Sequence, residues 1–421
     1  MSDDEIQLRR LYHECFHDDP AFEDAYFRYL YSRDRSVISK RKGQVVSGLI
    51  YTDCGLNVAS GLEYETDAAY LSGICTHPSW RGRGLAGQLI RRTLAKCYQA
   101  GYGYATLIPA DAGLAGYYAR FGFANCFDYV EETYYPSPEE LALPDLLAAE
   151  AVSEEGVEFA ETTDYLYEGL PSAPLLYYRF TGSGLTSSLY YTDMRVLTRG
   201  YLFGDDALHD LRIEDVYLYG GMVWKVATQE REIVAEAIVY PRDGHLLVTS
   251  LVCDNVECRM YMLSLLAAHY RLPEIHIIRP PRLFTPINGT PIGLEGELAE
   301  GETDGIATSL VARRGRSDYS PVRPLGMARL VAADMLVPLV AEAYPEVMTS
   351  FSLNDPILPE NSGVYTLPGD GTAYFHKRGK APQVTVAQLT QALIGYHVAD
   401  LPEALRCFPT GIPYMHTMLN K

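Results

Sequence analysis

Long hydrophobic runs are absent from this 421-residue sequence. A membrane-spanning helix needs about 20 consecutive apolar residues, and the longest candidate, 325–344, is interrupted by Arg329 and Pro338. The N-terminus, Met1–Glu5, is acidic, whereas a secretory signal peptide begins with basic residues and continues with apolar ones. We therefore expect no membrane span and a cytoplasmic location.

Positive charge is also scarce. The 35 Lys and Arg residues face 54 Asp and Glu residues, which gives a formal net charge of −19 at pH 7. Binding to a nucleic-acid backbone needs a basic patch, so a nucleic-acid partner is not expected. An acidic surface attracts cations and suits a small cationic substrate, although it serves solubility equally well.

Paired cysteines and histidines are missing as well. The eight cysteines are scattered without a Cys-x-x-Cys pair, and Cys253 and Cys258 have no partners at zinc-finger spacing. The ten histidines show no His-Glu-x-x-His pattern. We expect buried, reduced thiols and no metal ion.

The sequence does contain enough apolar material for true cores. Hydrophobic residues make up 48% and charged residues 21%, which excludes a disordered chain. The length predicts about two to four domains. Changes in pattern place them at 1–140, 157–292 and 306–421, with a Pro/Glu/Ala-rich linker at 136–156 and a Gly/Glu-rich run at 293–305. Helices and strands mix throughout, so the predicted fold class is α+β.

The first part begins with two helices and continues with strands, a long helix and more strands, as hydrophobic spacing and turn residues indicate. The predicted helices are Asp3–Cys15, Pro20–Tyr31, Gly84–Gln99 and a helix-like stretch at Leu114–Arg120. The predicted strands are Ser36–Ser39, Val45–Tyr51, Ala68–Thr76, Tyr104–Ile108 and strands within Phe121–Tyr135.

The second part repeats this order of strands, helix and strand, with a helix at Val256–His269 and a strand at Glu274–Ile278. The third part is a further mixture of both elements. Its predicted elements are a strand near Thr308–Arg313, a strand–helix unit at Met327–Tyr344, strands at Met348–Asp355, Gly363–Leu367 and Thr372–Lys377, and helices at Val386–Tyr396 and Leu401–Cys407.

One stretch, Leu71–Gly87, has the properties of an anion site. A strand runs through a proline-containing turn into a Gly/Arg-rich loop and then into the start of a helix. Glycines let backbone N–H groups approach a phosphate, and a helix N-terminus adds partial positive charge. The loop lacks the Lys-Ser/Thr ending of a nucleotide-triphosphate loop and the Gly-x-Gly-x-x-Gly order of a dinucleotide fold.

The segment Arg81-Gly82-Arg83-Gly84-Leu85-Ala86 fits the pattern [QR]-x-x-G-x-[GA]. It resembles the pyrophosphate-binding loop of the GCN5-related N-acetyltransferases, the GNAT superfamily. A strand before the loop, a long helix after it and two helices ahead of the first strands also resemble a GNAT domain. The alternative is a structural glycine turn with solvated arginines.

A second match narrows the resemblance. Tyr118–Phe123, which reads Y-x-R-F-G-F, follows Ile108–Asp111 and resembles the Eis-like (enhanced intracellular survival) acetyltransferases. Ser352–Asp355 and Asn361–Tyr365 resemble that family's last module. The resemblance implies two tandem GNAT folds, a C-terminal domain similar to sterol carrier proteins, and a homo-oligomer, commonly a hexamer. The middle copy has no such loop before its helix at Val256, so we expect it to be degenerate.

The resemblance also implies how acetyl-CoA, the co-substrate, is held. Backbone N–H groups of the strand end would bind the pantetheine and the thioester carbonyl, the loop would bind the pyrophosphate, and the next strand would splay away to admit the molecule. The implied residues are Ile74, Cys75 and Thr76 for the strand end, Arg81, Gly82, Arg83, Gly84, Leu85, Ala86 and Gly87 for the loop, and Ala110 and Asp111 for the splayed strand.

In the same resemblance Tyr118 is the general acid. A neutral amine attacks the thioester, and a phenol with an ordinary pKa near 10 can protonate the departing thiolate. The alternative is that Tyr118, one of 33 tyrosines, only packs beside Tyr117, which is the second choice of donor.

The predicted base is the carboxylate of the C-terminal residue, Lys421, again by resemblance. Three carboxylates ahead of the core strand, Glu63, Glu65 and Asp67, are alternatives acting through water. Cys75 with His77 two residues later suggests an acyl-cysteine route, but a backbone role for Cys75 is preferred.

The sequence thus predicts an acetyl-CoA-dependent N-acetyltransferase acting on a primary amine. The acceptor would be a polyamine, an aminoglycoside-like aminosugar or a lysine side chain, the last of which would make it a protein acetyltransferase. A different class remains open, in which the third domain carries an apolar ligand and the GNAT folds are a non-catalytic scaffold.

Overall fold

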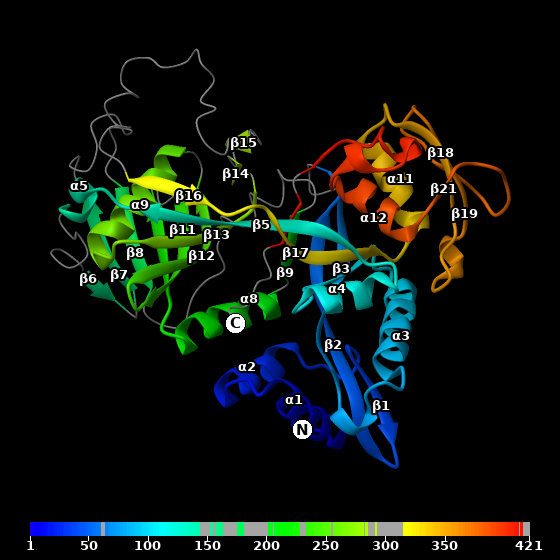
Figure 1. Cartoon of the computed structure of the whole chain (residues 1–421), viewed down its shortest axis with the longest axis horizontal. Coiled ribbons are helices and arrows are strands. Elements are labelled where there is room, and N and C mark those ends of the chain that lie inside the picture. Colours follow the sequence, from blue (N-terminus) through cyan, green and yellow to red (C-terminus); the bar gives the residue numbers. More distant parts are fainter. Residues whose placement is uncertain are drawn as a thin grey trace. The chain divides into compact units, whose positions relative to one another are not determined.

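The computed structural model of the protein (Figure 1) describes residues 1–59, 64–143, 152–154, 157–162, 175–180, 201–204, 206–227, 233–253, 256–281, 283–284, 291–292, 315–411 and 413–415. By its internal contacts the chain divides into two compact units. The first comprises Met1–Asp128, Thr198–Leu211 and Pro324–Met418, and the second comprises Tyr129–Leu197, Arg212–Arg323 and Leu419–Lys421. The three-part division at 1–140, 157–292 and 306–421 stays a prediction.

The first 128 residues contain the helices and strands that the sequence predicts, with three strands longer than expected. The elements are α1 (Asp3–Phe16), α2 (Pro20–Leu30), β1 (Ser36–Arg41), β2 (Gln44–Asn57), β3 (Glu65–Thr76), the 3₁₀ turn η2 (Pro78–Trp80), α3 (Leu85–Ala100), β4 (Tyr104–Leu107), α4 (Ala112–Ala119) and β5 (Ala124–Tyr135), whose last residues belong to the second unit.

Local sequence sets the ends of these helices. Ser2 caps α1 by accepting a hydrogen bond from the backbone N–H of Glu5 at 3.2 Å. Asp19 caps α2 in the same way, and Pro20 fits the first helical position because its missing N–H has no partner to lose there. Gly101, with a φ of 86°, ends α3 in the left-handed conformation that glycine adopts at low cost.

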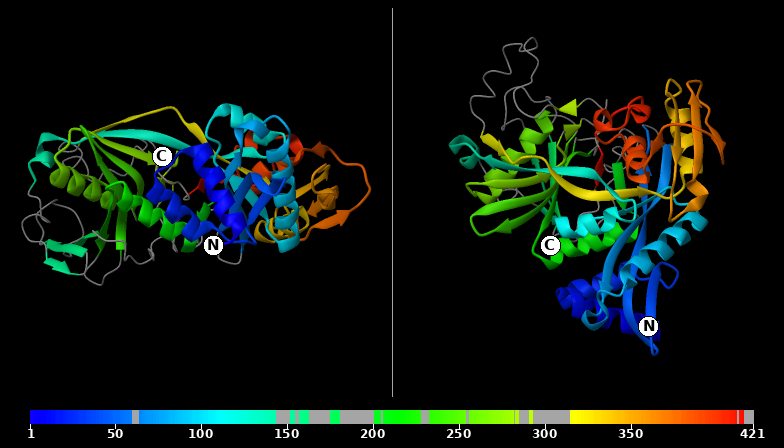
Figure 2. Two further views of the ribbon diagram at one scale, coloured as in Figure 1. Left: turned by 90° about the horizontal axis from the view of Figure 1, so that it is seen from below. Right: turned by 45° about the vertical axis from the view of Figure 1, so that its right-hand side comes forward.

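A mixed sheet forms the centre of the first unit. Its order is β22-β9-β2-β3-β4-β17, and β1 pairs with β2; β9 is Tyr201–Gly204, β17 is Arg323–Leu330 and β22 is Tyr414–Met415. The β3–β4 and β22–β9 pairs are parallel, while β2–β3 and β4–β17 are antiparallel. Helices α1 and α2 lie on one face of β2 and β3, and α3 lies on the other (Figures 1 and 2).

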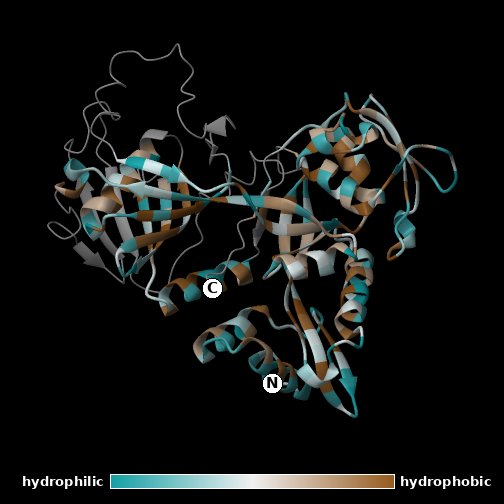
Figure 3. Ribbon diagram, viewed as in Figure 1, coloured by the Kyte–Doolittle hydropathy of each residue, from teal (hydrophilic) through white to brown (hydrophobic). Residues whose placement is uncertain are grey.

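The core of this sheet lies under α3. Leu89, Ile90 and Leu94 of the helix pack against Leu49 and Leu71 of the sheet, and all five are buried. Each such side chain contributes about 1.5–3 kcal/mol on burial. Figure 3 shows the hydrophobic residues of α3 interleaved with hydrophilic ones along the helix. Within the described residues, no helix is both long and apolar enough to cross a bilayer.

The C-terminal part of the first unit adds a smaller sheet in the order β20-β19-β18-β21 and two helices. Its elements are α11 (Ala333–Ala343), β18 (Met348–Leu353), η3 (Pro359–Asn361), β19 (Gly363–Pro368), β20 (Tyr374–His376), β21 (Gln383–Val384), α12 (Val386–Ile394), η4 (Val398–Asp400) and η5 (Glu403–Leu405). They confirm the predictions between Met327 and Tyr396, whereas the strand predicted near Thr308–Arg313 lies outside the described residues.

One predicted helix, Leu401–Cys407, is wrong. The chain there forms a single 3₁₀ turn, η5, instead of an α-helix. Pro402 and Pro409 leave six residues between them, which is less than two α-helical turns, and neither proline can donate a backbone hydrogen bond.

The second unit is built around another mixed sheet, in the order β5-β13-β12-β11-β10-β8-β7-β6, with β16 pairing with β5. The helix and strand predicted at Val256–His269 and Glu274–Ile278 are present. Its elements are β6 (Val152–Glu154), β7 (Val157–Thr162), β8 (Leu175–Phe180), α8 (Asp206–Leu218, which begins in the first unit), β10 (Met222–Ala227), β11 (Ile233–Arg242), β12 (His245–Cys253), α9 (Val256–Tyr270), β13 (Ile275–Arg279), β14 (Leu283–Phe284), β15 (Pro291–Ile292) and β16 (Arg316–Tyr319).

The two units repeat one supersecondary pattern. In each, three antiparallel strands lead through a helix into a strand parallel to the third: β1-β2-β3-α3-β4 in the first unit and β10-β11-β12-α9-β13 in the second. Both third strands carry a bulge of one residue against the second strand. The helix follows the strand after eight residues in the first unit but after two in the second.

The linker predicted at 136–156 is wrong for its first residues. They form a short helix, α5 (Pro138–Leu141), with a capping box between Ser137 and Glu140. Glu140 is buried, and its carboxylate accepts hydrogen bonds from Tyr134 at 2.6 Å and Ser264 at 2.7 Å. A solvated linker would not bury a carboxylate with two donors, so this segment belongs to the fold of the second unit.

Candidate active site

The candidate site begins where β3 leaves its neighbour β4. The pairing of β3 with β4 covers only Ala68–Tyr70, and β3 continues to Thr76. Toward β2, one residue (Leu49) faces two of β3 (Gly73 and Ile74), which defines a bulge. Within the described part of the chain, the splay leaves the end of β3 without a strand neighbour on the β4 side.

Gly73 makes the bulge. Its φ of 58° lies in the left-handed region, where a side chain is strained. A Cβ at this position would lie 2.7 Å from the hydroxyl of Tyr26 and 3.2 Å from the ring of Tyr12. The aromatic side chains of α1 and α2 therefore press directly on the bulge, and the Tyr26 hydroxyl is hydrogen-bonded to Ser72 at 2.7 Å.

The turn after β3 is held by its own side chains. His77 accepts a hydrogen bond from the backbone N–H of Ser79 through Nδ1 at 3.2 Å and so caps the short 3₁₀ turn. The Arg81 Nε donates to the carbonyl oxygen of Thr76 at 3.1 Å. The Arg83 guanidinium lies 4.5 Å from the ring centroid of Trp80. Both arginines are exposed, so this turn presents two fixed positive charges.

The loop then enters α3 without a capping side chain. Gly82 and Gly84 have φ values of 76° and 73°, and Gly84 is the N-cap residue, where no side chain accepts a hydrogen bond from the helix. A Cβ at either glycine would meet no atom within 4 Å. The glycines are thus required by conformation, and no side chain caps the first N–H groups of α3, as in an anion site.

The remaining predicted loop residues divide between the loop and the core. Ala86 is half-buried, whereas Leu85 and Gly87 are buried in the fold. A Cβ on Gly87 would lie 2.9 Å from the ring of Phe121, so Gly87 lets α3 approach that ring. Close packing against Phe121 therefore explains why glycine occupies position 87.

Tyr118 is brought to the same region. It lies in α4, is 7% exposed and belongs to the hydrophobic cluster that includes Leu71 and Leu107, against which Ile74 packs. Burial first, then the neighbouring Tyr117 and Asp111, raises the pKa of Tyr118 to about 12. The raised pKa keeps the Tyr118 phenol protonated at neutral pH. Within the described residues its hydroxyl has no hydrogen-bond partner.

Asp111 and Ala110 lie three to four residues beyond the end of β4 at Leu107. The Asp111 carboxylate accepts a hydrogen bond from the backbone N–H of Leu114 at 2.7 Å and caps α4. The side chain of Asp111 therefore helps to position α4, the helix that carries Tyr118.

Two of the three alternative bases, Glu65 and Asp67, do not reach the end of β3. Asp67 precedes Ile74 by seven strand residues, which at about 3.3 Å each separates them by about 23 Å, and Glu65 is farther away. Glu63 and Lys421 lie outside the described residues. Among the described residues, no group of three or more His, Cys, Asp or Glu side chains converges as metal ligands do.

Cys75 and His77 do not form a nucleophile–base pair. The ring nitrogens of His77 lie beside Ser79 (2.8 Å) and Glu14 (3.2 Å). Cys75 is buried, and its Sγ lies 3.6 Å from the carbonyl oxygen of Gly48. The backbone of Cys75 is fixed by Ser47, whose hydroxyl donates to its carbonyl oxygen at 2.8 Å.

A buried ion pair from the C-terminal part supports this site. Arg329 of β17 donates through Nε to the carbonyl oxygen of Phe121 at 2.7 Å and through Nη2 to Asp355 at 2.7 and 2.8 Å. Gly122, with a φ of 87°, approaches the same guanidinium closely, because a Cβ there would lie 3.2 Å from the Arg329 Nε. Sequence reasoning noted the stretches around Phe121 and Asp355 but did not connect them.

With this geometry described, comparisons identify the first part of the chain. The family model of the acetyltransferase (GNAT) domain matches residues 1–126. This part of the chain is therefore a GNAT acetyltransferase domain, and the protein is an N-acetyltransferase by that domain, with acetyltransferase activity of the GNAT type. No curated protein matches the sequence.

Solved structures extend the fold likeness to the whole chain. A conserved Enterococcus faecalis protein described as a probable N-acyltransferase matches at 14% identity with a TM-score of 0.65, over 98% of this chain and 96% of that one. A GCN5-related N-acetyltransferase from Anabaena variabilis matches at 16% and 0.65, over 98% and 97%. Eis1 from Mycobacterium abscessus matches at 14% and 0.64, over 99% and 97%. At such low identity these matches show the shared fold.

Proposed function

We propose that the protein transfers the acetyl group of acetyl-CoA to a primary amine of a small cationic substrate. The observation that carries this proposal is the loop Arg81–Gly84, which leads into the uncapped N-terminus of α3. Arg81 and Arg83 would neutralise the pyrophosphate, and the first N–H groups of α3, from Leu85 to Gly87, would donate to it.

In the proposed mechanism the end of β3 binds the acyl group. Backbone N–H groups of Ile74, Cys75 and Thr76 would hold the pantetheine and stabilise the oxyanion that develops when a neutral amine attacks the thioester. The splay between β3 and β4, with Ala110 and Asp111 beyond the end of β4, supports this assignment.

Tyr118 is the proposed general acid. Its hydroxyl lacks another partner among the described residues and packs with Ile74 in one cluster. A pKa of about 12 keeps the phenol protonated, and the same dry surroundings raise the proton affinity of the departing thiolate, which keeps the transfer balanced. Tyr117, which is less buried and stacks with Arg120, is the second choice.

The acceptor is proposed to be a polyamine, an aminoglycoside-like aminosugar or a lysine amine. Besides the net charge of −19, a local carboxylate supports a cation: Asp18 accepts a hydrogen bond from Tyr12 at 2.8 Å, and the Tyr12 ring touches the Gly73 bulge. The proposed base that deprotonates the amine is the terminal carboxylate of Lys421, by resemblance to Eis-like enzymes.

The Eis-like architecture is proposed for the whole chain: an acetyl-CoA-binding GNAT domain at 1–140, a degenerate GNAT fold at 157–292 and a sterol-carrier-like domain at 306–421. The repeated strand–helix–strand order supports a second GNAT fold. Its degeneracy is supported by the two-residue link between β12 and α9, which has no room for a phosphate loop. A cytoplasmic homo-oligomer, by resemblance a hexamer, completes the proposal.

The test combines binding with turnover. Titration calorimetry of the full-length protein with coenzyme A should show one site per chain, and a thiol-release assay with acetyl-CoA should show turnover with at least one of a polyamine, an aminoglycoside and a lysine-containing peptide. Arg81→Gln should weaken coenzyme A binding about tenfold or more, because a charge-assisted contact is lost.

Arg92→Gln is the matched control. Arg92 lies on the same helix, α3, but its guanidinium donates to the carbonyl oxygen of Ile38 at 3.0 Å, away from the loop. Its loss should leave coenzyme A affinity unchanged. Absence of both coenzyme A binding and thiol release in folded protein would reject the proposal and favour the apolar-ligand carrier.

A further inference from the structure

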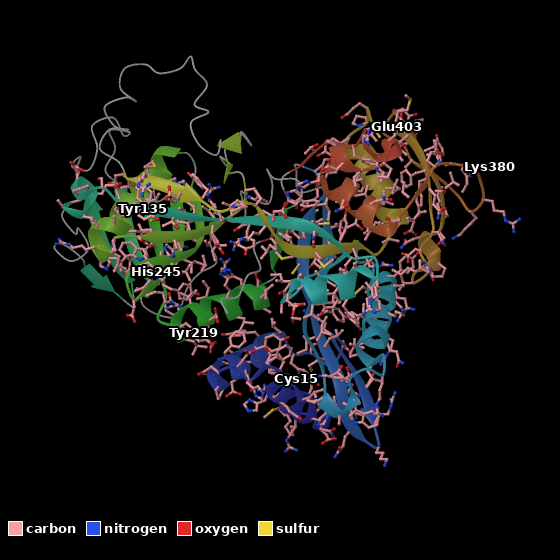
Figure 4. The ribbon with its side chains drawn as sticks, viewed as in Figure 1. Cys15, Tyr135, Tyr219, His245, Lys380 and Glu403 are labelled. Carbon is pink, nitrogen blue, oxygen red and sulfur yellow. The ribbon has the colours of Figure 1, made fainter. Side chains whose placement is uncertain are left out.

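Two cysteines far apart in the sequence meet beside the anion loop. Cys15, labelled in Figure 4, lies in the last turn of α1 and is partly exposed. Its Sγ is 3.6 Å from the carbonyl oxygen of Thr76. Cys75 directly precedes Thr76 in β3, and each of the two thiols shifts the pKa of the other, so the two side chains are neighbours. Cys75, at the end of β3, is 3% exposed.

Arg81 joins this pair to the loop. Its Nη2 lies 4.0 Å from the Cys15 Sγ while its Nε donates to the carbonyl oxygen of Thr76 at 3.1 Å. Glu14, the residue before Cys15, lies near the two cysteines, but its carboxylate contacts the His77 ring nitrogen at 3.2 Å. The guanidinium is therefore the positive charge that touches the sulfur.

The contacts make the two thiols unequal. Hydrogen bonding from Cys75, and then from Arg81 with its charge, lowers the pKa of Cys15, while burial and Glu14 oppose this effect. Contact with Cys15 and burial raise the pKa of Cys75. The partly exposed Cys15 therefore ionises more readily than the buried Cys75, which keeps its proton, as in a reactive dithiol.

We propose that Cys15 and Cys75 are an oxidation site, at which a peroxide converts the two thiols into an intramolecular disulfide. The Cys15 thiolate attacks one oxygen of hydrogen peroxide, forms a sulfenic acid and releases hydroxide. The Cys75 sulfur then attacks the sulfenic sulfur; its proton and the sulfenic hydroxyl leave as water. The two sulfurs lose two electrons, and one peroxide molecule is reduced.

Oxidation changes the charge that Arg81 experiences. In the reduced protein the Cys15 thiolate partly neutralises the guanidinium, whereas a disulfide carries no charge. If the proposed function holds, on which this consequence rests, coenzyme A should bind about fivefold more tightly to the oxidised protein, since a unit charge at 4.0 Å in a solvated setting has about this effect.

The first experiment maps the bond directly. Reduced full-length protein is treated with a small excess of hydrogen peroxide, alkylated and digested, and the peptides are identified by mass spectrometry. We expect a cross-linked peptide joining Cys15 and Cys75 that dithiothreitol removes. Cys407→Ser is the control: Cys407 is exposed and remote in sequence, and its loss should leave the cross-link intact.

Two variants separate the steps. Cys75→Ser should accumulate a sulfenic acid at Cys15 that dimedone traps, and Cys15→Ser should give no cross-link and leave Cys75 reduced. Cys15→Ser changes a partly exposed side chain, so it keeps the test valid if the buried substitution unfolds the protein. An unmodified Cys15 at a peroxide dose that oxidises Cys407, or a cross-link to another cysteine, would overturn the proposal.

Coenzyme A titration of the same samples tests the consequence. Oxidised wild type and reduced Cys15→Ser should both bind about fivefold more tightly than reduced wild type, because both lack the thiolate. Equal affinities in all three would reject the charge effect. If none binds, the acetyl-CoA proposal fails while peptide mapping still decides the disulfide.

Discussion

At the scale of single residues, Tyr118 tests the proposed chemistry most directly. The residue is buried, its phenol is protonated, and its hydroxyl has no hydrogen-bond partner among the described residues. We expect Tyr118→Phe to lower kcat about a hundredfold or more, since it removes the proton donor, with little change in the dissociation constant of coenzyme A. Steady-state kinetics and calorimetry measure the two effects separately.

Tyr117→Phe supplies the matched control, because Tyr117 is adjacent and shares a ring contact with Tyr118 at 5.5 Å. Its kcat should stay within about threefold of wild type if general acid catalysis belongs to Tyr118. A larger loss in Tyr117→Phe than in Tyr118→Phe would reassign the acid.

The raised pKa of Tyr118 also predicts a pH profile. The group holds its proton above the ordinary tyrosine value of about 10 and releases it near 12. The thiol-release rate should therefore show no alkaline loss due to this group below about pH 10. A descending limb near pH 9 that disappears in Tyr118→Phe would contradict the assignment.

Gly73 carries a second residue-level prediction. Alanine there would be strained at a φ of 58° and would collide with the Tyr26 hydroxyl, so Gly73→Ala should destabilise the protein by about 1–3 kcal/mol and reduce activity by displacing the bulge. Gly116→Ala is the control: it lies in α4 with nothing within 4 Å and should stabilise by about 0.5–1 kcal/mol. Urea unfolding measures both.

The sequence predicts some of these residues and not others, for physical reasons. The Arg81–Gly84 loop is local, and its glycines and charges mark it without knowledge of the fold. Gly73 is less distinctive: an isolated glycine inside a strand pattern indicates a bulge only weakly. The contact of Cys15 with Cys75 depends on how α1 packs on β3, which no local pattern encodes.

At the scale of elements, Arg329 joins three segments: β17, the turn after α4 and the segment after β18. Arg329→Met should destabilise the first unit by about 3–5 kcal/mol, because it leaves Asp355 charged and buried and the Phe121 carbonyl without its donor. Equilibrium unfolding in urea gives the difference.

An exposed pair provides the comparison. Arg316 and Asp318 lie 3.5 Å apart with 73% and 56% of their side chains exposed, so Arg316→Gln should change stability by less than about 1 kcal/mol. Similar losses in Arg316→Gln and Arg329→Met would show that burial does not set the difference.

The elements themselves follow the sequence where the pattern is long or capped. The helices α1, α2 and α3 have periodic apolar faces or clear caps, and the sequence predicts each of them. The two errors have different causes. Tertiary partners of Glu140 turn a presumed linker into a capped helix, whereas the prolines around 403–408 are local and permit only a 3₁₀ turn. The pairing of β17 with β4 is non-local and leaves no trace in either segment.

At the scale of the whole molecule, each unit has its own tryptophan. Trp80 lies in the anion loop of the first unit, and Trp224 is buried in the second. Coenzyme A at about 100 times its dissociation constant should stabilise the first unit by about 2.7 kcal/mol. In Trp224→Phe, the unfolding transition followed by Trp80 fluorescence should shift when coenzyme A is added. In Trp80→Phe, the transition followed by Trp224 fluorescence should stay where it is.

A shift of both transitions by the same amount would mean that the two units unfold as one cooperative system. The control is Trp224→Phe with adenosine alone, which lacks the pyrophosphate and should leave the Trp80 transition in place.

The bond from Arg329 to Phe121 spans 208 residues. During synthesis on the ribosome, at about 5–20 residues per second, this partner emerges roughly 10–40 s after the segment that it fixes. During this interval the nascent acetyltransferase domain lacks both Arg329 and the β17 neighbour of β4, so it cannot complete its fold. A gene fragment that stops at residue 126 would encode a polypeptide that never acquires Arg329 or β17.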